Sequence, residues 1–106
     1  MSIAKVGLPR HELKTWPEFF QAIVDGKKTA ELRFDDRGFQ VYHLLWLREW
    51  DSVEERYTGR EASAIITHIL HGDTRFGLAE GFVMMSLGRV TMWYADTAPR
   101  RQEGQR

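Results

Sequence analysis

Three side chains in the segment 26–39 have the types and spacing that a binding or catalytic site needs. The segment reads GKKTAELRFDDRGF and contains Lys28, Glu31 and Arg33. Lysine offers a compact positive charge and arginine a planar fork, and both bind phosphate or the edge of a base. We expect Glu31 to hold one of these cations in place, although a carboxylate can also serve as a general base. All three are candidates for ligand binding, and Lys28 and Glu31 are also candidates for catalysis.

A β-strand over residues 29–34 would position these side chains. Apolar residues occur at every second place, and successive side chains of a strand point to opposite faces. We expect the apolar face to lie in the core and the polar face to line a site. The apolar face consists of Ala30, Leu32 and Phe34, and the polar face of Thr29, Glu31 and Arg33.

Four further residues are candidates for ligand binding, and Arg60 is one of them. His11 and Lys14 precede the first helix and could face the same site, although His11 could equally be a structural histidine. Tyr57 could stack on a base, although a loop tyrosine that packs on the domain is the commoner case.

Glu49 is a candidate for catalysis or for a structural ion pair at a strand end. It shares a strand face with apolar residues, so its burial would require a cationic partner, for which Arg33 and Arg60 are the candidates. His68 and His71 point to opposite faces of a strand, so the sequence predicts no metal site. No motif for a cofactor is present.

The composition is that of one ordinary globular domain. The 106 residues include 15 basic and 15 acidic side chains and no cysteine. The balanced charge gives no overall attraction for nucleic acid, so local clusters would have to bind any anionic partner. No apolar run approaches the about 18 residues of a membrane span, and the first residues lack the apolar region of a signal peptide. We therefore expect a cytoplasmic protein without a membrane partner.

One helix is predicted directly before the 26–39 segment. Thr15 and Glu18 have the spacing of a capping box, and Gly26 has the position of a left-handed residue at the helix end. Apolar residues recur at helical spacing and form one stripe that we expect to be buried. The stripe consists of Trp16, Phe19, Phe20, Ile23 and Val24.

The remaining elements are predicted to be strands, which makes the fold class α+β and mainly β. We expect a small closed or nearly closed barrel with the short helix packed at its mouth. The domain should span residues 11–94, with a lead-in segment at 1–10 and a disordered tail at 97–106. The predicted strands are 11–14, 29–34, 44–50, 61–70, 82–87 and 90–94, with a polar loop at 51–60 and a glycine-rich connection at 71–81.

Several motifs, in order along the chain, resemble the DUF3850 family, an ASCH-like branch of the PUA-like superfamily. They are HELKTWPEFFQAIVDGKKTAELRFDDRGF, LLWLREWD, YTGR and GFVMMSLG, and the first contains the signature G-x-K-x-x-E-x-R. The resemblance covers residues 11–88. It implies a PUA/ASCH-like β-barrel with a cleft between helix and barrel for RNA or a nucleoside.

The chain departs from the family pattern at two points. The family usually has Gly-Asp before the LLWLREW strand, where this chain has Tyr42 and His43. An ASCH-like branch of amidohydrolases acts on N4-acetylcytidine with a lysine base and a threonine three residues later. Here Glu31 stands three residues after Lys28, so the threonine mechanism does not transfer.

These observations favour an RNA-binding or nucleotide-binding module without chemistry of its own. The first alternative is a small hydrolase, either a nucleoside amidohydrolase or a ribonuclease, that uses Lys28 and Glu31 with Arg33 or Glu49. The second is a phage-borne interaction protein that blocks a nucleoprotein complex, for which the partner would be a protein or ribonucleoprotein. A large exposed apolar patch would favour this last alternative.

Overall fold

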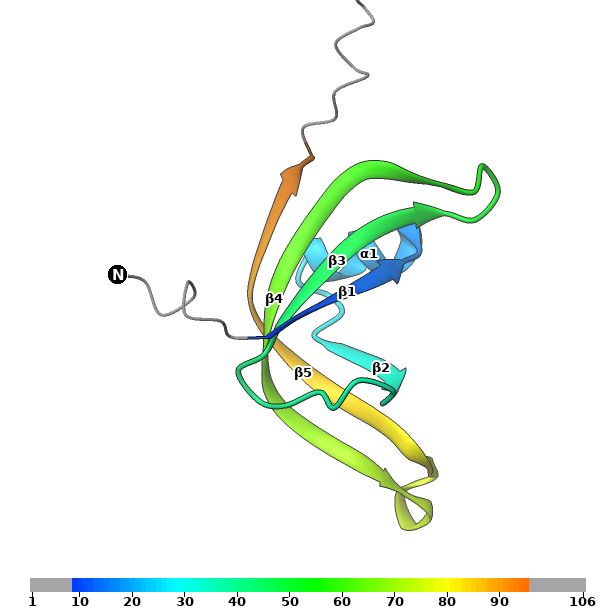
Figure 1. Ribbon diagram of the computed structural model, residues 1–106, viewed down its shortest axis with the longest axis vertical. Helices are drawn as coiled ribbons and strands as arrows, with labels where there is room; N and C mark the ends of the chain where they lie inside the picture. Colours follow the sequence, from blue (N-terminus) through cyan, green and yellow to red (C-terminus); the bar gives the residue numbers. More distant parts are fainter. Residues whose placement is uncertain (1–8, 96–106) are drawn as a thin grey trace, which may run out of the picture.

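A single curled sheet with one helix makes up residues 9–95, the part of the chain that the computed structural model describes (Figure 1). The predicted tail at 97–106 and nearly all of the predicted lead-in at 1–10 lie outside the described residues. The elements are β1 (Arg10–Thr15), α1 (Pro17–Val24), β2 (Ala30–Phe34), β3 (Leu44–Asp51), β4 (Arg56–Asp73), the 3-10 helix η2 (Thr74–Phe76) and β5 (Leu78–Tyr94).

The sheet has the strand order β1-β3-β4-β5-β2 and is open. β1 pairs with β3 in parallel, and the other three pairs are antiparallel. β1 and β2 are the two edge strands, and the strand order contains no backbone ladder between them. The predicted mainly β domain with one helix is therefore confirmed, whereas the predicted closure of the barrel is wrong.

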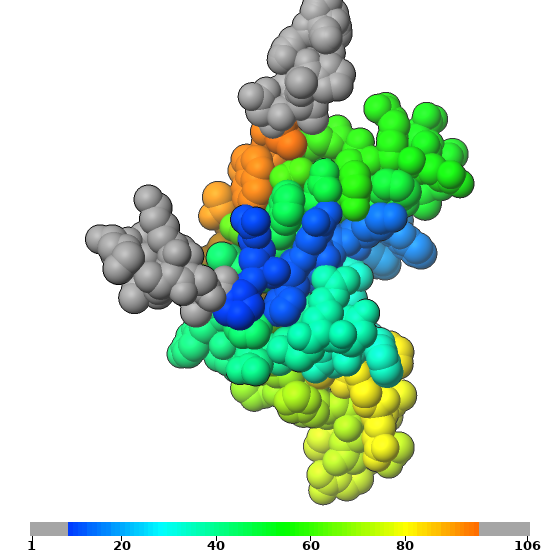
Figure 2. Space-filling model, viewed as in Figure 1, coloured from blue at the N-terminus to red at the C-terminus, as the bar shows by residue number. Residues whose placement is uncertain are grey.

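Arginine side chains bridge the gap between the two edge strands. Arg33 Nη2 donates to the carbonyl oxygen of Lys14 at 2.6 Å, and Arg37 Nη1 donates to the carbonyl oxygen of Glu12 at 2.5 Å. We call this contact the arginine seam. Figure 2 shows the residues of β1 (blue) beside those of the β2 region (cyan). The side chains of the seam bind carbonyl groups of β1 that a neighbouring strand would bind in a closed barrel.

The helix begins without the predicted capping box. Trp16 is the N-cap and makes no side-chain cap hydrogen bond, while Pro17 occupies the first helical position. Thr15 is the last residue of β1, where its buried hydroxyl donates to the carbonyl oxygen of Leu13 at 3.5 Å. The hydroxyl is thus held in the sheet and cannot cap the helix. The predicted left-handed glycine at the helix end is confirmed, because Gly26 has a φ of 76°.

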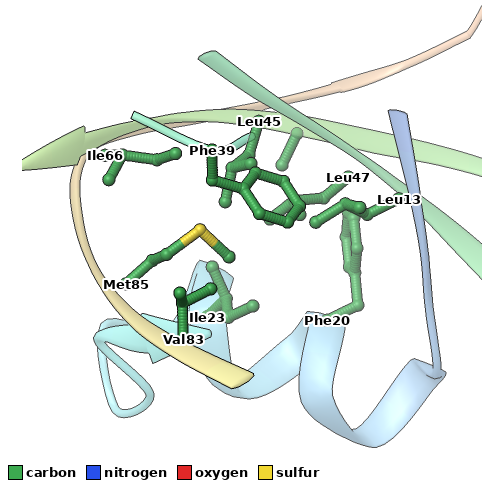
Figure 3. Close-up of a cluster of buried hydrophobic side chains, with 10 residues drawn as sticks. Leu13, Phe20, Ile23, Phe39, Leu45, Leu47, Ile66, Val83 and Met85 are labelled. Carbon is green, nitrogen blue, oxygen red and sulfur yellow. The ribbon is translucent and has the colours of Figure 1, made fainter. Parts of the chain in front are cut away.

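The core lies between α1 and the inner face of the sheet (Figure 3). Phe20 and Ile23 are buried there as predicted, and Val24 is half-buried. Trp16 is 52% exposed and Phe19 is also exposed, so their predicted burial is wrong. An eight-residue helix that packs on one side cannot bury five large residues at once. The strands and the loop between β2 and β3 contribute the remaining residues of this cluster, which are Leu13, Phe39, Leu45, Leu47, Ala62, Ile66, Val83 and Met85.

β2 has the opposite orientation to the one predicted. Glu31 is only 7% exposed, whereas Leu32 and Phe34 are 52% and 57% exposed. Paired residues of neighbouring strands share a face, and Glu31 pairs with buried Met85 while Leu32 pairs with exposed Met84. The pairing with β5 therefore turns the acidic residue inward.

The last two strands are longer than predicted. The expected polar loop ends at residue 55, because β4 begins at Arg56 and continues to Asp73. The expected connection at 71–81 is reduced to the short turn that contains η2. The two final predicted strands form one continuous β5, in which Arg89 takes a positive φ of 53° and the pairing with β4 shifts register. The β4–β5 hairpin extends beyond the rest of the domain (Figure 1).

Tyr42 occupies a backbone conformation that favours glycine. Its φ is 74°, in the left-handed region, and its N–H donates to the carbonyl oxygen of Ile66 at 2.7 Å. The glycine that the resemblance leads us to expect at this position would adopt this conformation without strain. Tyr42 thus keeps the turn, but with a strained backbone conformation.

Candidate nucleic-acid interface

A cleft of about 470 Å³ opens between the start of α1, the end of β1 and strand β2. Its walls combine aromatic rings with charged side chains, and its volume lies in the range of small-molecule sites. The lining residues are Lys14, Thr15, Trp16, Phe19, Glu31, Leu32, Arg33, Phe34 and Phe82.

Two aromatic pairs contribute to the cleft walls. The rings of Trp16 and Phe19 are stacked, with centroids 6.0 Å apart and planes at 14°. The rings of Phe34 and Phe82 meet edge to face at 5.5 Å. A Cβ at Gly81 would lie 2.7 Å from the ring of Phe34, so the glycine allows this ring to pack on the backbone. All four rings are partly exposed to solvent, and exposed rings are suitable for stacking on a base.

Glu31 lies between two cations beside the cleft. Its Oε1 is 3.8 Å from Lys28 Nζ and 3.8 Å from Arg33 Nε, and it accepts the N–H of Leu32 at 2.9 Å. Lys28 Nζ also donates to the carbonyl oxygen of Ala30 and lies 5.9 Å from the ring of Phe19. The structure therefore brings together the three residues of the sequence signature and gives Glu31 a positioning contact with each cation.

Lys14 and Arg33 connect the cleft with the arginine seam. Both line the cleft, and the guanidinium of Arg33 binds the main-chain carbonyl of Lys14. The amine of Lys14 lies 3.9 Å from the ring centroid of Trp50, on the outer face of the sheet. Arg33 is thus both a cation of the cleft and a structural bridge.

His11 and Tyr57 lie outside the cleft. His11 Nε2 is 2.9 Å from Nδ1 of His43, and its ring packs against Phe39 at 4.8 Å. Burial, followed by the charge of His43, lowers the pKa of His11 below its ordinary value. The ring of Tyr57 packs on Trp50 at 4.9 Å. Neither residue lines the cleft, so the structure does not place them with the other predicted ligand-binding residues.

Buried Glu49 forms an ion pair with Arg60, whose side chain is partly exposed. Arg60 Nε donates to Glu49 Oε1 at 3.0 Å and Arg60 Nη2 to Oε2 at 2.8 Å, while Thr58 Oγ1 donates to Oε1 at 2.5 Å. Burial alone would raise the pKa of Glu49, but the hydrogen bonds from Arg60 and Thr58 outweigh it and lower this pKa. The guanidinium of Arg60 also lies 4.9 Å from the ring of Phe20. These contacts support the structural interpretation of the pair.

Sequence reasoning missed the aromatic part of the cleft. It assigned Trp16, Phe19 and Phe34 to the core and did not consider Phe82 as a site residue. One signal was available, because the helix carries more large apolar residues than one buried stripe can hold. For Phe34 no such signal exists, since alternation alone does not say which face of a strand is buried.

The fold and the cleft define a small, mainly β domain with an aromatic and cationic groove beside its one helix. The chain belongs to the DUF3850 family, a domain of unknown function, whose family model matches residues 10–87. The sequence resemblance to this family is thereby confirmed.

A phage protein and a solved crystal structure are among the known proteins similar to this chain. A protein of Escherichia phage P2, described as an uncharacterized 12.9 kDa protein in the GpA 3′ region, is 39% identical over 59 residues. The match covers 56% of this chain and 52% of the phage protein, so it spans about half of each. The crystal structure of a mutant of ZmASCH from Zymomonas mobilis superposes with a TM-score of 0.62 at 20% identity, over 91% of this chain and 81% of that one. This likeness shows the fold. Within residues 9–95, no helix is long and apolar enough to cross a membrane.

Proposed function

We propose that this protein binds single-stranded RNA or a nucleotide in the cleft, without cleaving it. The observation that carries the proposal is the combination of exposed aromatic rings and cations around one hollow. Trp16 offers a half-exposed indole, and Lys28 and Arg33 supply positive charge on either side of Glu31. Single-stranded nucleic acids are bound in this way, through stacking of bases on aromatic rings and neutralisation of phosphates. The ASCH-like fold also supports the proposal.

The first experiment measures the stacking contribution. The binding of a fluorescent single-stranded RNA is followed by anisotropy for the wild type and for Trp16→Ala. Stacking of one base is worth about 1–3 kcal/mol, so the dissociation constant should rise about fivefold or more. Phe76→Ala is the matched control, because this exposed ring lies at the tip of the β4–β5 hairpin. Equal losses in both variants would contradict the assignment of the cleft.

The second experiment measures the electrostatic contribution. The affinity should fall with salt, with a log–log slope of about −0.7 for each neutralised phosphate of a single strand. Lys28→Ala should make this slope less steep by about 0.7, the contribution of one neutralised phosphate. Lys27→Ala is the control, because this neighbouring lysine is exposed and, among the described residues, forms no ion pair with the cleft residue Glu31, whereas Lys28 does. A salt-independent affinity, or no affinity for any RNA or nucleotide, would refute the proposal.

The hydrolase alternative makes a different prediction for the same site. The contacts of Glu31 with both cations favour an anchoring role, and we expect no turnover of N4-acetylcytidine. Product release from acylated cytidines is measured for the wild type and for Glu31→Gln. Turnover that Glu31→Gln abolishes would make the chain a hydrolase.

One observation favours the alternative of a protein-binding module. The outer face of β2 and β5 carries four large exposed apolar side chains, paired across the two strands. Contiguous exposed apolar surface often marks a protein interface. If this alternative holds, RNA binding is absent at every salt concentration. The four residues are Leu32, Phe34, Phe82 and Met84.

A further inference from the structure

A second hollow, of about 300 Å³, lies on the outer face of the sheet, away from the core. Side chains of β1, β3, β4 and β5 line it, and no residue of the cleft takes part. The lining residues are Arg10, Leu44, Leu45, Trp46, Glu61, Ser63 and Trp93.

The strand register brings these side chains onto one face. Trp46 of β3 pairs with Ser63 of β4, and Glu61 of β4 pairs with Trp93 of β5. Paired residues share a face, and so do residues two apart along a strand. The small Ser63 therefore lies directly opposite Trp46 of β3, and on its other side it pairs with Thr91 of β5, two residues from Trp93 on the same face.

One wall of the hollow is fixed by a chain of hydrogen bonds. Trp46 Nε1 donates to Glu61 Oε1 at 2.9 Å, and Arg48 Nε donates to Glu61 Oε2 at 3.1 Å. Arg48 Nη1 in turn donates to Glu12 Oε2 at 2.7 Å. Glu61 is buried, and these contacts satisfy both of its oxygens. A wall that is ordered before the ligand arrives reduces the entropic cost of binding.

Three groups in the hollow remain free to contact a ligand. The indole of Trp93 is 38% exposed. Among the described residues, the hydroxyl of Ser63 makes no hydrogen bond, and the guanidinium of Arg10 has no carboxylate within salt-bridge distance. Arg10 lies 5.0 Å from the ring centroid of Trp46, which holds it at the edge of the hollow. Together these groups supply a stacking surface, a hydrogen-bonding hydroxyl and a positive charge.

This combination matches one nucleotide. A base can stack on Trp93 and bond to Ser63 through its edge, while Arg10 contacts the phosphate. A cationic ligand fits less well, because the guanidinium groups of Arg10 and Arg48 already lie beside Trp46. The volume of about 300 Å³ is at the lower end of the range for small-molecule sites, which suits a single base with its sugar.

β1 connects this hollow with the cleft. Arg10 lines the hollow and Lys14 lines the cleft. They are four residues apart on one strand, so they share a face and their Cα atoms are about 13 Å apart. A single strand of nucleic acid that follows β1 would meet a cation at each end.

We propose that the outer-face hollow is a second nucleotide site, which binds one base of a single strand whose other part occupies the cleft. This inference rests on the proposed function and makes its ligand more specific. The ligand is a single-stranded oligonucleotide of several nucleotides, and a free nucleoside fills only one of the two sites.

The test compares single-stranded RNA of two and of eight nucleotides on the full chain. Wild-type protein should bind the octamer at least about fivefold more tightly than the dinucleotide, since one further stacked base contributes about that much. Trp93→Ala should abolish this difference, and Trp93→Phe should retain most of it because a stacking ring remains. Tyr94→Ala is the matched control, since this neighbouring ring is 72% exposed and does not line the hollow.

The outcomes separate this inference from the proposed function. If Trp16→Ala weakens the binding of both RNAs and Trp93→Ala leaves octamer binding at the wild-type value, the second site is refuted and the cleft stands. If wild-type protein binds neither RNA, both are refuted. Arg10→Ala provides a second variant at an exposed position, and an unchanged octamer affinity there would also count against the second site.

Discussion

Removal of the arginine that pairs with buried Glu49 should cost a large part of the stability. Arg60→Met keeps an unbranched apolar stem beside Phe20 and removes the guanidinium that donates two hydrogen bonds to Glu49. Loss of one partner from a buried ion pair typically costs about 3–5 kcal/mol, because the remaining charge is uncompensated. Domains of this size are stable by only about 5–15 kcal/mol. We therefore expect a marginally folded variant.

The pH dependence of the free energy of unfolding provides a second test of the same prediction. In the wild type the pKa of Glu49 is lowered despite burial, through Arg60 and Thr58. Its contribution to stability is thus present above the unfolded pKa of about 4.3 and is lost as the pH falls through the folded pKa. In Arg60→Met the effect of burial remains without the guanidinium, so the pKa of Glu49 should rise. The stability difference between the two proteins should then narrow as the pH falls from about 7 to about 3.

Urea unfolding followed by tryptophan fluorescence measures both quantities. The double variant Glu49→Gln with Arg60→Met should recover part of the loss, because it leaves no buried charge. Arg75→Met provides the control, since the pair of Arg75 with Asp73 is exposed and such pairs contribute less than about 1 kcal/mol. A loss below about 1 kcal/mol in Arg60→Met, or a difference that widens in acid, would refute the reasoning.

Two further predictions concern packing and backbone strain. Phe20→Ala should lower the free energy of unfolding by about 3–5 kcal/mol. Leu32→Ala should change it by about 0.5 kcal/mol or less, because the side chain of Leu32 is half exposed. Thermal melts compare the two variants, and equal losses would contradict the observed orientation of β2. Tyr42→Gly should raise the free energy of unfolding by about 1 kcal/mol, because glycine adopts the left-handed conformation without strain. Tyr42→Ala keeps that strain and should give no such gain. Urea unfolding measures both variants, and equal effects of the two substitutions would count against strain at this position.

The parts of the fold that could be predicted from sequence are those with a strong local pattern. β3 was predicted at 44–50 from a run of leucines and tryptophans that is mainly apolar on both faces, and it is observed at Leu44–Asp51. The helix was predicted from its apolar spacing, and Phe20 and Ile23 are buried as expected. Lys28, Glu31 and Arg33 were grouped by their types, their spacing and the family signature, and the structure places Glu31 within 3.8 Å of both cations.

The remaining errors concern facts that depend on distant parts of the chain. Alternation along β2 fits both orientations, and its pairing with Met84 and Met85 decides between them. The closure of a barrel depends on whether the last edge strands meet, and here Arg33 and Arg37 bridge them instead. Neither fact has a local signal, because each is set by contacts between segments far apart in sequence.

The same open arrangement has a consequence for the order of folding. The turns between β3 and β4 and between β4 and β5 join neighbouring segments, with pairs as close as Asp51 with Arg56 and Asp73 with Leu78. The edge strands instead pair with distant segments, as Arg10 does with Leu44 and Ala30 with Ser86. Contacts that close long loops carry a larger entropic cost and tend to form late. The three-stranded meander should therefore form first, and the cleft should exist only after β1 and β2 have docked on either side of it.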